Sequence, residues 1–146
     1  VTVKTTDMKD ITTQELFSGK KVVIFAVPGA FTPTCSEQHL PGFITNSDAI
    51  RAKGVDDIIC ISVNDSFVMD CWGKDRGTGD KVTMIADGNA VFAKALGLDF
   101  DGSGIGFGTR SQRYAAIVED GVVTKLAVEK PMAFDVSSAE AILAAL

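Results

Sequence analysis

Runs of hydrophobic residues along the chain predict a central β-sheet. Two uninterrupted β-branched runs, Lys21–Val27 (KVVIFAV) and Asp57–Val63 (DIICISV), are typical of strands that are buried on both faces. Shorter runs predict four further strands, at Val1–Thr5 (an edge strand), Val82–Ala86, Arg113–Val118 and Val122–Val128. The last two flank Asp120-Gly121, a pair typical of the tight turn of a β-hairpin.

Between the strands the pattern changes to that of helices. In chain order, helices are expected from Thr12 or Thr13 to Phe17 and at Thr34–Ala52, Ser66–Asp75, Asn89–Leu96 and Ser137–Leu146. A kink is expected at Pro41, because proline lacks the backbone N–H that a helix interior needs. The glycine-rich segment Leu98–Gly108 is expected to be a loop.

The order of these elements is βαβαβα, then a hairpin and a final helix, which is the layout of a thioredoxin-like domain. The sequence therefore predicts an α/β protein with a mixed central sheet flanked by helices on both faces, two on each. The 146 residues suit a single domain spanning 1–146. A chain of this length buries roughly two thirds of the surface that it exposes when unfolded.

Charge and composition exclude several classes of partner. The net charge of −5 and the pI of about 4.7 repel a phosphate backbone, so nucleic acid is not expected to bind. No apolar run reaches the roughly 20 residues of a membrane span. No signal peptide is visible, although a chain that begins at Val1 leaves open a removed targeting segment. The odd count of three cysteines suits a reducing compartment, so a cytoplasmic location is expected, with a mature organellar form as the alternative.

The segment with the most chemical information is Val27–Phe43 (VPGAFTPTCSEQHLPGF), which follows a buried strand and opens a helix. Cys35 falls in the first turn of that helix, where free backbone N–H groups and the helix dipole favour a thiolate. The Thr32 hydroxyl lies three residues earlier, and Pro28 and Pro33 stiffen the loop. This setting favours a reactive Cys35 over the alternative of a small, inert buried residue.

At these residues the sequence resembles a known family. The pattern Pro28-x-x-x-Thr32-x-x-Cys35 is similar to the active-site pattern of peroxiredoxins, and the longer string PGAFTPTCSEQHLPGF resembles the type II, or peroxiredoxin 5, subfamily. The resemblance extends over essentially the whole chain, through SVNDSFVMDCWGK, ADGNAVF, GTRSQRYAAIVEDG and the terminal DVSSAEAIL, which is similar to plant and bacterial members.

The resemblance implies that the protein reduces hydrogen peroxide and alkyl hydroperoxides. In such enzymes a thiolate attacks one peroxide oxygen and becomes a sulfenic acid. Cys35 would be this peroxidatic cysteine, Thr32 would hydrogen-bond the peroxide, Pro28 would shield the sulfenic acid, and Arg113 would stabilise the developing charge. No metal and no organic cofactor is expected.

Two further residues are candidates for supporting roles. Arg110 shares the string TRSQRY with Arg113, and it is expected either to brace the site or to be a solvated surface charge. His39 is the only histidine and lies four residues after Cys35, hence on the same helical face. It is expected to support the site rather than to act as a general base, with a packing role as the alternative.

The other two cysteines bear on how an oxidised Cys35 is reduced. Cys60 lies in an apolar strand, which by itself favours an inert core residue, but plant type II enzymes carry a cysteine here that is regarded as resolving. Cys71 is expected to be structural. No cysteine follows it, so the C-terminal resolving cysteine of animal members is absent. Glutathione or glutaredoxin is favoured as reductant over an internal Cys35–Cys60 disulfide, and thioredoxin stays open.

Two other functions are alternatives to the peroxidase. A thiol–disulfide oxidoreductase on the same fold needs a CxxC pair, and Thr32 occupies the place of its first cysteine. A non-catalytic redox sensor would tolerate the loss of Thr32 and Arg113. Relatives pair through loops near the active site, and Phe31, Phe43, Phe67 and Trp72 are expected to surround such loops, so a homodimer is expected.

Overall fold

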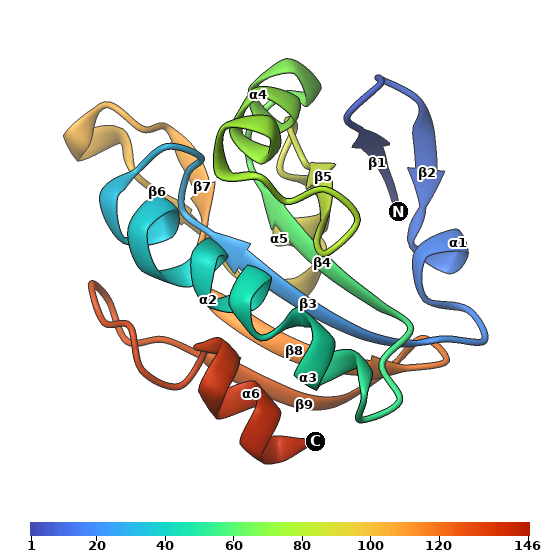
Figure 1. Cartoon of the computed structure of the whole chain (residues 1–146). Coiled ribbons are helices and arrows are strands. Elements are labelled where there is room, and N and C mark those ends of the chain that lie inside the picture. Colours follow the sequence, from blue (N-terminus) through green and yellow to red (C-terminus); the bar gives the residue numbers. More distant parts are fainter.

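The computed structural model describes residues 1–146 and contains a seven-stranded mixed sheet (Figure 1). The strand order is β2-β1-β5-β4-β3-β8-β9, and a separate pair is formed by β6 and β7. The strands are β1 (Thr2–Thr5), β2 (Asp10–Thr12), β3 (Lys21–Val27), β4 (Asp57–Ser62), β5 (Thr83–Ala86), β6 (Asp99–Asp101), β7 (Thr109–Ser111), β8 (Tyr114–Glu119) and β9 (Val122–Val128). The neighbours β3, β4 and β5 are parallel, whereas β8 is antiparallel to β3.

The helices are short. They are α1 (Thr13–Phe17), a π-helix η1 (Cys35–His39), α2 (Leu40–Thr45), α3 (Ser47–Arg51), α4 (Ser66–Arg76), α5 (Val91–Leu96), a 3₁₀-helix η2 (Ser103–Ile105) and α6 (Ala139–Ala145). Local chemistry sets several of their ends. Gly97 closes α5 in the left-handed conformation at φ 70°, and the Ser138 side chain accepts a hydrogen bond from the Ala141 N–H at the start of α6. None of these helices is long and apolar enough to cross a bilayer.

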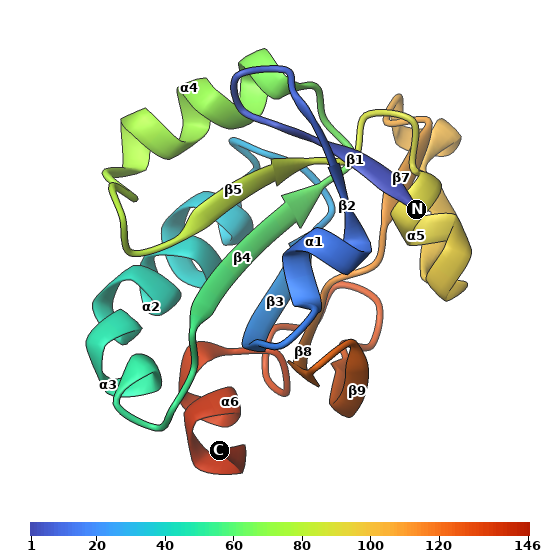
Figure 2. The same cartoon turned by 90° about the vertical axis from the view of Figure 1, so that its right-hand side faces the viewer.

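The sheet separates two hydrophobic cores. Figure 2 shows helices on both sides of the sheet. Alternate residues of β3 face opposite cores, with Phe25 on one side and Ile24 on the other. Helices α2, α3, α4 and α6 cover the Phe25 side, and α1 and α5 cover the Ile24 side. The expected fold class is confirmed, but the prediction of two helices on each face is wrong.

The helix expected over residues 34–52 consists of three segments. A π-turn, in which the Leu40 N–H donates to the Cys35 carbonyl, comes directly before Pro41. The sequence predicts a kink at this place because Pro41 has no N–H to donate, and the π-turn has the same cause. A second break at Asn46 (φ −94°, ψ 7°), which separates α2 from α3, was not expected from the sequence.

The sequence pattern failed for the shortest strands. The segment 1–5 is not an edge strand, because the three-residue β2 pairs on its outer side. The segment 98–108, expected to be a loop, contains β6 and η2 and leads into β7, which pairs with β6. Strands of three residues are too short for an alternating pattern to stand out from the glycines around them.

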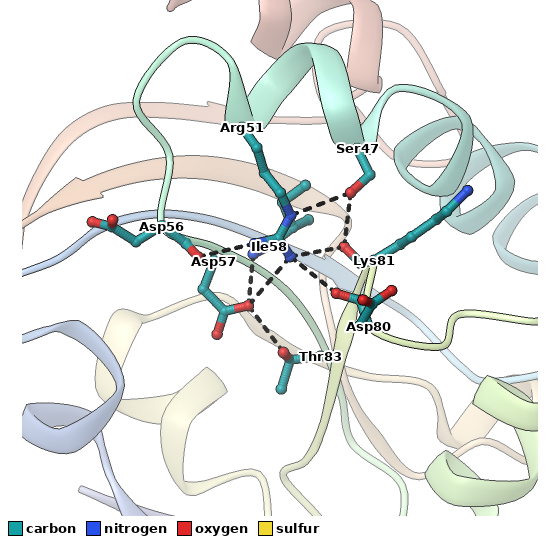
Figure 3. Close-up of polar contacts among 8 residues, drawn as sticks. All are labelled: Ser47, Arg51, Asp56, Asp57, Ile58, Asp80, Lys81 and Thr83. Atoms are coloured by element: carbon teal, nitrogen blue, oxygen red, sulfur yellow. Dashed lines mark hydrogen bonds and ion pairs between the residues drawn. The ribbon is translucent and has the colours of Figure 1, made fainter.

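Arg51 ties together the end of the sheet that lies away from the Cys35 segment (Figure 3). Its guanidinium donates to the carbonyls of Asp56 (3.0 Å), Asp80 (3.2 Å) and Lys81 (3.2 Å). These carbonyls come just before β4 and β5, so Arg51 joins α3 to the starts of both strands. Nothing in the sequence pattern indicated this role.

Candidate active site

Cys35 lies just beyond the carboxyl end of β3. The strand ends at Val27, where it pairs with Ser62 at the carboxyl end of β4, and the chain then turns into the helical segment that carries Cys35. The Cys35 side chain is fully buried. The Thr32 hydroxyl, in the same turn, donates to the Gly29 carbonyl at 2.7 Å. Its oxygen lone pairs are therefore left to accept a hydrogen bond.

Arg113 contacts the Cys35 sulfur although the two residues are far apart in the sequence. It directly precedes β8, whose first residue, Tyr114, pairs with Ala26 at the end of β3. Antiparallel pairing thus brings the start of β8 to the edge where β3 ends. The Nη2 group of Arg113 donates to Sγ of Cys35 at 3.0 Å. The half-buried guanidinium thus places a positive charge in contact with the sulfur.

Arg110 contacts the loop rather than the sulfur. Its Nη1 donates to the Pro28 carbonyl at 3.2 Å, its Nε donates to the Phe107 carbonyl at 3.0 Å, and its guanidinium lies 4.9 Å from the centre of the Phe107 ring. A Cβ on Gly29 would lie only 2.8 Å from Nη1 of Arg110, so a glycine is needed for this approach. Arg110 therefore braces the Pro28 loop.

His39 is the second residue that contacts the Arg113 guanidinium. Its Nε2 lies 2.9 Å from the Ser137 carbonyl, which can only accept, so the ring proton is on Nε2. Its Nδ1 then accepts from Nη1 of Arg113 at 2.8 Å. Burial, and then the charge of Arg113, lower the pKa of His39 to about 3. The imidazole is therefore neutral at physiological pH and is no candidate for a general acid.

Two side-chain contacts that sequence reasoning missed hold the Cys35 segment. Nε1 of Trp72, on α4, donates to the Ser36 hydroxyl at 2.9 Å. The Asn64 side-chain oxygen accepts from the Ala30 N–H at 3.0 Å. Asn64 follows β4 at the sheet edge where Cys35 also lies, and this shared edge is the sequence signal that could have found it.

All three cysteines are free, and they lie in different environments. Cys60 is fully buried in the middle of β4, opposite Phe25 of β3. Burial, and then the neighbouring Cys35, raise the pKa of the Cys60 thiol well above its usual range. Cys71, expected to be structural, is exposed on α4 and packs into neither core. No group of three His, Cys, Asp or Glu side chains is gathered in a way that could hold a metal ion.

The four aromatic residues expected at a dimer contact fall into two pairs. Phe43 and Trp72 are fully buried, so they present no surface to a second copy of the chain. Phe31 is 47% exposed and Phe67 is 70% exposed. Phe31 packs on Trp72 with ring centres 6.4 Å apart, which places it over α4 beside the Cys35 segment.

Comparison with known proteins identifies the family. The redoxin family model matches residues 1–143. Peroxiredoxin-2E, chloroplastic, of Arabidopsis thaliana is 51% identical over 144 residues, and Peroxiredoxin-2E-2, chloroplastic, of Oryza sativa subsp. japonica is 52% identical over 143 residues. The matches cover 97% and 96% of this chain, which spans only 62% and 64% of the lengths of these relatives.

A solved structure matches over a larger share of its length. The reduced form of Prx3 from Vibrio vulnificus, in complex with hydrogen peroxide, is 57% identical and superposes with a TM-score of 0.96. The match covers 100% of this chain and 94% of that one. The chain therefore belongs to the redoxin family, as a peroxiredoxin.

Proposed function

We propose that the protein is a thiol-dependent peroxidase that reduces hydrogen peroxide and alkyl hydroperoxides at Cys35. The observation that carries this proposal is the hydrogen bond of 3.0 Å from Arg113 to the buried Cys35 sulfur. The Arg113 cation is held against the sulfur nucleophile, where it can stabilise the negative charge that develops when the sulfur attacks a peroxide. The similarity to a structure titled as a complex with hydrogen peroxide supports this choice of substrate.

In the proposed reaction an electron pair of the Cys35 thiolate attacks one peroxide oxygen. The S–O bond forms as the O–O bond breaks, and the departing oxygen takes a proton and leaves as water or as an alcohol. Cys35 is oxidised to a sulfenic acid and the peroxide is reduced. The residue roles follow from the contacts around the sulfur and require no metal or organic cofactor.

Thr32 and Arg113 act on the peroxide in different ways. The Thr32 hydroxyl donates a hydrogen bond to the Gly29 carbonyl, so its oxygen accepts a hydrogen bond from the O–H of the peroxide and orients the peroxide. Arg113 stabilises the charge that develops as the O–O bond breaks. Pro28, whose carbonyl is held by Arg110, has no N–H and shields the sulfenic acid from a second oxidation.

The catalytic cycle closes when thiols reduce the sulfenic acid. One thiol condenses with it to a mixed disulfide and water, and a second thiol displaces the Cys35 thiolate. An external source of these thiols is favoured, because Cys60 lies fully buried in the sheet. Glutathione with glutaredoxin is the favoured external source, with thioredoxin as the alternative. This activity would serve antioxidant defence and redox homeostasis, in the cytoplasm or as a mature organellar form.

The protein is further proposed to act as a homodimer. Phe31, beside the Cys35 segment, and Phe67, on α4, are exposed aromatic residues, and burying them between two copies would remove apolar surface from water.

The test of the peroxidase is to mix the reduced protein with one equivalent of hydrogen peroxide and to trap sulfenic acid with dimedone. Trapping at Cys35 is expected, as is catalytic turnover of peroxide in a separate assay without dimedone that supplies glutathione and glutaredoxin, and Cys35→Ser should abolish both. The exposed Cys71 offers a matched control, because Cys71→Ser should change neither. Wild-type turnover in Cys35→Ser would refute the proposal. Reaction with disulfides but not with peroxide would instead indicate a thiol–disulfide oxidoreductase.

A further inference from the structure

A buried carboxylate fastens the loop between β9 and α6. Glu129 follows β9 and is 7% exposed, and its Oε2 accepts from the Asp135 N–H (2.7 Å), the Ser137 N–H (2.8 Å) and the Ser137 hydroxyl (2.7 Å). Partial burial opposes ionisation, but these hydrogen bonds outweigh it and lower the pKa of Glu129. Glu129 is therefore an anion at neutral pH, and it fixes the backbone at Ser137.

The Ser137 carbonyl is the next link toward the sulfur. It accepts the Nε2–H of His39 at 2.9 Å, which leaves the Nδ1 lone pair of His39 as the acceptor for Nη1 of Arg113 at 2.8 Å. The other tautomer would turn an N–H of the ring toward the guanidinium and leave the carbonyl without its donor. Only one tautomer of His39 therefore fits both neighbours.

No water can easily take the place of this carbonyl. The His39 ring is fully buried and packs against three phenyl rings, with centre-to-centre distances of 4.9 Å to Phe25, 5.6 Å to Phe43 and 5.1 Å to Phe134. Phe134 belongs to the loop that Glu129 fastens, and it also lies 5.9 Å from the Arg113 guanidinium. The loop thus supplies both the acceptor for Nε2 and part of the apolar cover.

We infer that Glu129 and Ser137 are positioning residues, which set the tautomer of His39 and through it aim the Arg113 guanidinium at the Cys35 sulfur. The chain of contacts runs without a break from Glu129 to Cys35. The inference rests on the proposed peroxidase function only for its kinetic readout. The tautomer of His39 is a property of the resting protein.

The tautomer is tested by ¹⁵N NMR of the imidazole, which is free of overlap because the chain has a single histidine. At pH 7 the wild type is expected to show the Nε2–H tautomer alone. Glu129→Ala should produce a mixture of tautomers, and Glu129→Gln, which keeps an acceptor oxygen, should restore most of the wild-type signal. Ser137→Ala tests the same link with less risk to folding, because it removes the hydroxyl and keeps the carbonyl. It should shift the signals in the same direction, by less.

The kinetic arm follows the fluorescence of Trp72, the only tryptophan, which contacts the residue after Cys35. Glu129→Ala should slow the reaction with peroxide about tenfold, a loss typical of removing a group that orients a reacting one. In a His39→Gln background the same change should cause no further loss. Glu119→Ala, at an exposed glutamate on β8, is the matched control and should leave both rate and tautomer unchanged.

Each outcome of the tautomer and rate measurements either supports or overturns the inference. An unchanged tautomer in both Glu129→Ala and Ser137→Ala, or equal losses of rate with and without His39, would overturn the inference. Should the wild type not reduce peroxide, the proposed function fails while the tautomer arm still stands. The rate at which iodoacetamide alkylates Cys35 then replaces the kinetic readout.

Discussion

Arg113 and Cys35 are 78 positions apart in the sequence, yet Nη2 of Arg113 lies 3.0 Å from Sγ of Cys35. The contact depends on the antiparallel pairing of β8 with β3, which sets the start of one strand beside the end of the other. A second hydrogen bond, to His39, prevents the guanidinium from turning away. The Cys35 sulfur and the Arg113 guanidinium are thus held by different elements of the fold, and the contribution of each residue can be tested separately.

The two arginines near the site should differ in their effect on the reaction. Arg113→Gln removes the cation at the sulfur and should slow the reaction with hydrogen peroxide by roughly 10²-fold or more. Arg110→Gln leaves the sulfur contact intact and should be milder, since Arg110 donates to the Pro28 and Phe107 carbonyls. Stopped-flow measurement with both purified variants is the check. A larger loss in Arg110→Gln would reverse the two assignments.

A neighbouring pair of threonines allows the Thr32 hydroxyl to be tested against a matched control. Thr32→Val removes the oxygen that is placed to accept from the peroxide, and should lower the rate of peroxide reaction by roughly 10²-fold. The Thr34 side chain makes no capping hydrogen bond, so Thr34→Val, two residues away, should have little effect. Circular dichroism confirms that both variants fold. Equal rates for the two would remove Thr32 from the proposed mechanism.

Local patterns in the sequence were enough to place some of these groups and not others. Cys35 could be placed at the carboxyl end of a strand, because the hydrophobic run before it predicts a strand and the pattern after it predicts a helix. The hairpin between β8 and β9 was likewise readable, since Asp120 and Gly121 adopt the positive φ angles of 47° and 80° that a tight turn requires.

Groups whose role depends on pairing between distant segments left no local signal. The Ser137 carbonyl contacts His39 only because the segment that leads into α6 lies beside η1, and a backbone carbonyl has no sequence signature. The aromatic residues show the same limit. Phe43 and Phe67 look alike in the sequence, but one lies in the core and the other is 70% exposed, because they face opposite ways on their helices.

Stability should depend on pH through His39 in a defined window. The folded protein keeps His39 neutral, with a pKa of about 3, whereas the unfolded chain binds a proton near pH 6.5. The unfolded state therefore gains protons first, and stability is lost as the pH falls from 6.5 toward 3. The free energy of unfolding should decrease by up to about 1.4 kcal/mol per pH unit from this one group.

Urea unfolding between pH 7 and pH 5 measures this slope. His39→Gln should flatten it, because the chain has no other histidine. Burial raises the pKa of Asp87, but this acts in the opposite direction, since a carboxyl with a raised pKa in the folded state adds stability as the pH falls. The lowered pKa of Glu129 stabilises the folded protein above about pH 4.5, and this stability is lost only as the pH falls further, below the measured range of pH 7 to 5. A slope of the same size in wild type and His39→Gln would show that His39 is not the group responsible.

Assembly should depend on the exposed phenylalanine of α4. Phe67→Asp places a charge where a dimer would bury an apolar ring, and should shift the protein toward the monomer in sedimentation velocity at high micromolar concentration. Val122, on β9, is 64% exposed and serves for comparison, because Val122→Asp should leave the dimer intact. A wild-type monomer in both redox states would contradict the proposed assembly.

The reduction of oxidised Cys35 is expected not to need Cys60. Cys60 is fully buried in the middle of β4 and pairs with Phe25 of β3 on one side and Met84 of β5 on the other. Bringing its sulfur to Cys35 would require part of this strand to open, at a cost of about 1 kcal/mol for each hydrogen bond lost. Its raised pKa also keeps Cys60 a thiol, which attacks a sulfenic acid more slowly than a thiolate does.

An external thiol meets neither obstacle, so Cys60→Ser should retain most of the wild-type turnover when glutaredoxin and glutathione are supplied. Cys71→Ser, at the exposed cysteine, controls for side reactions of surface thiols. Mass spectrometry of the oxidised wild type should show glutathione on Cys35 and no peptide that links Cys35 to Cys60. Near-complete loss of turnover in Cys60→Ser, together with that linked peptide, would establish the internal disulfide and show that β4 opens during the cycle.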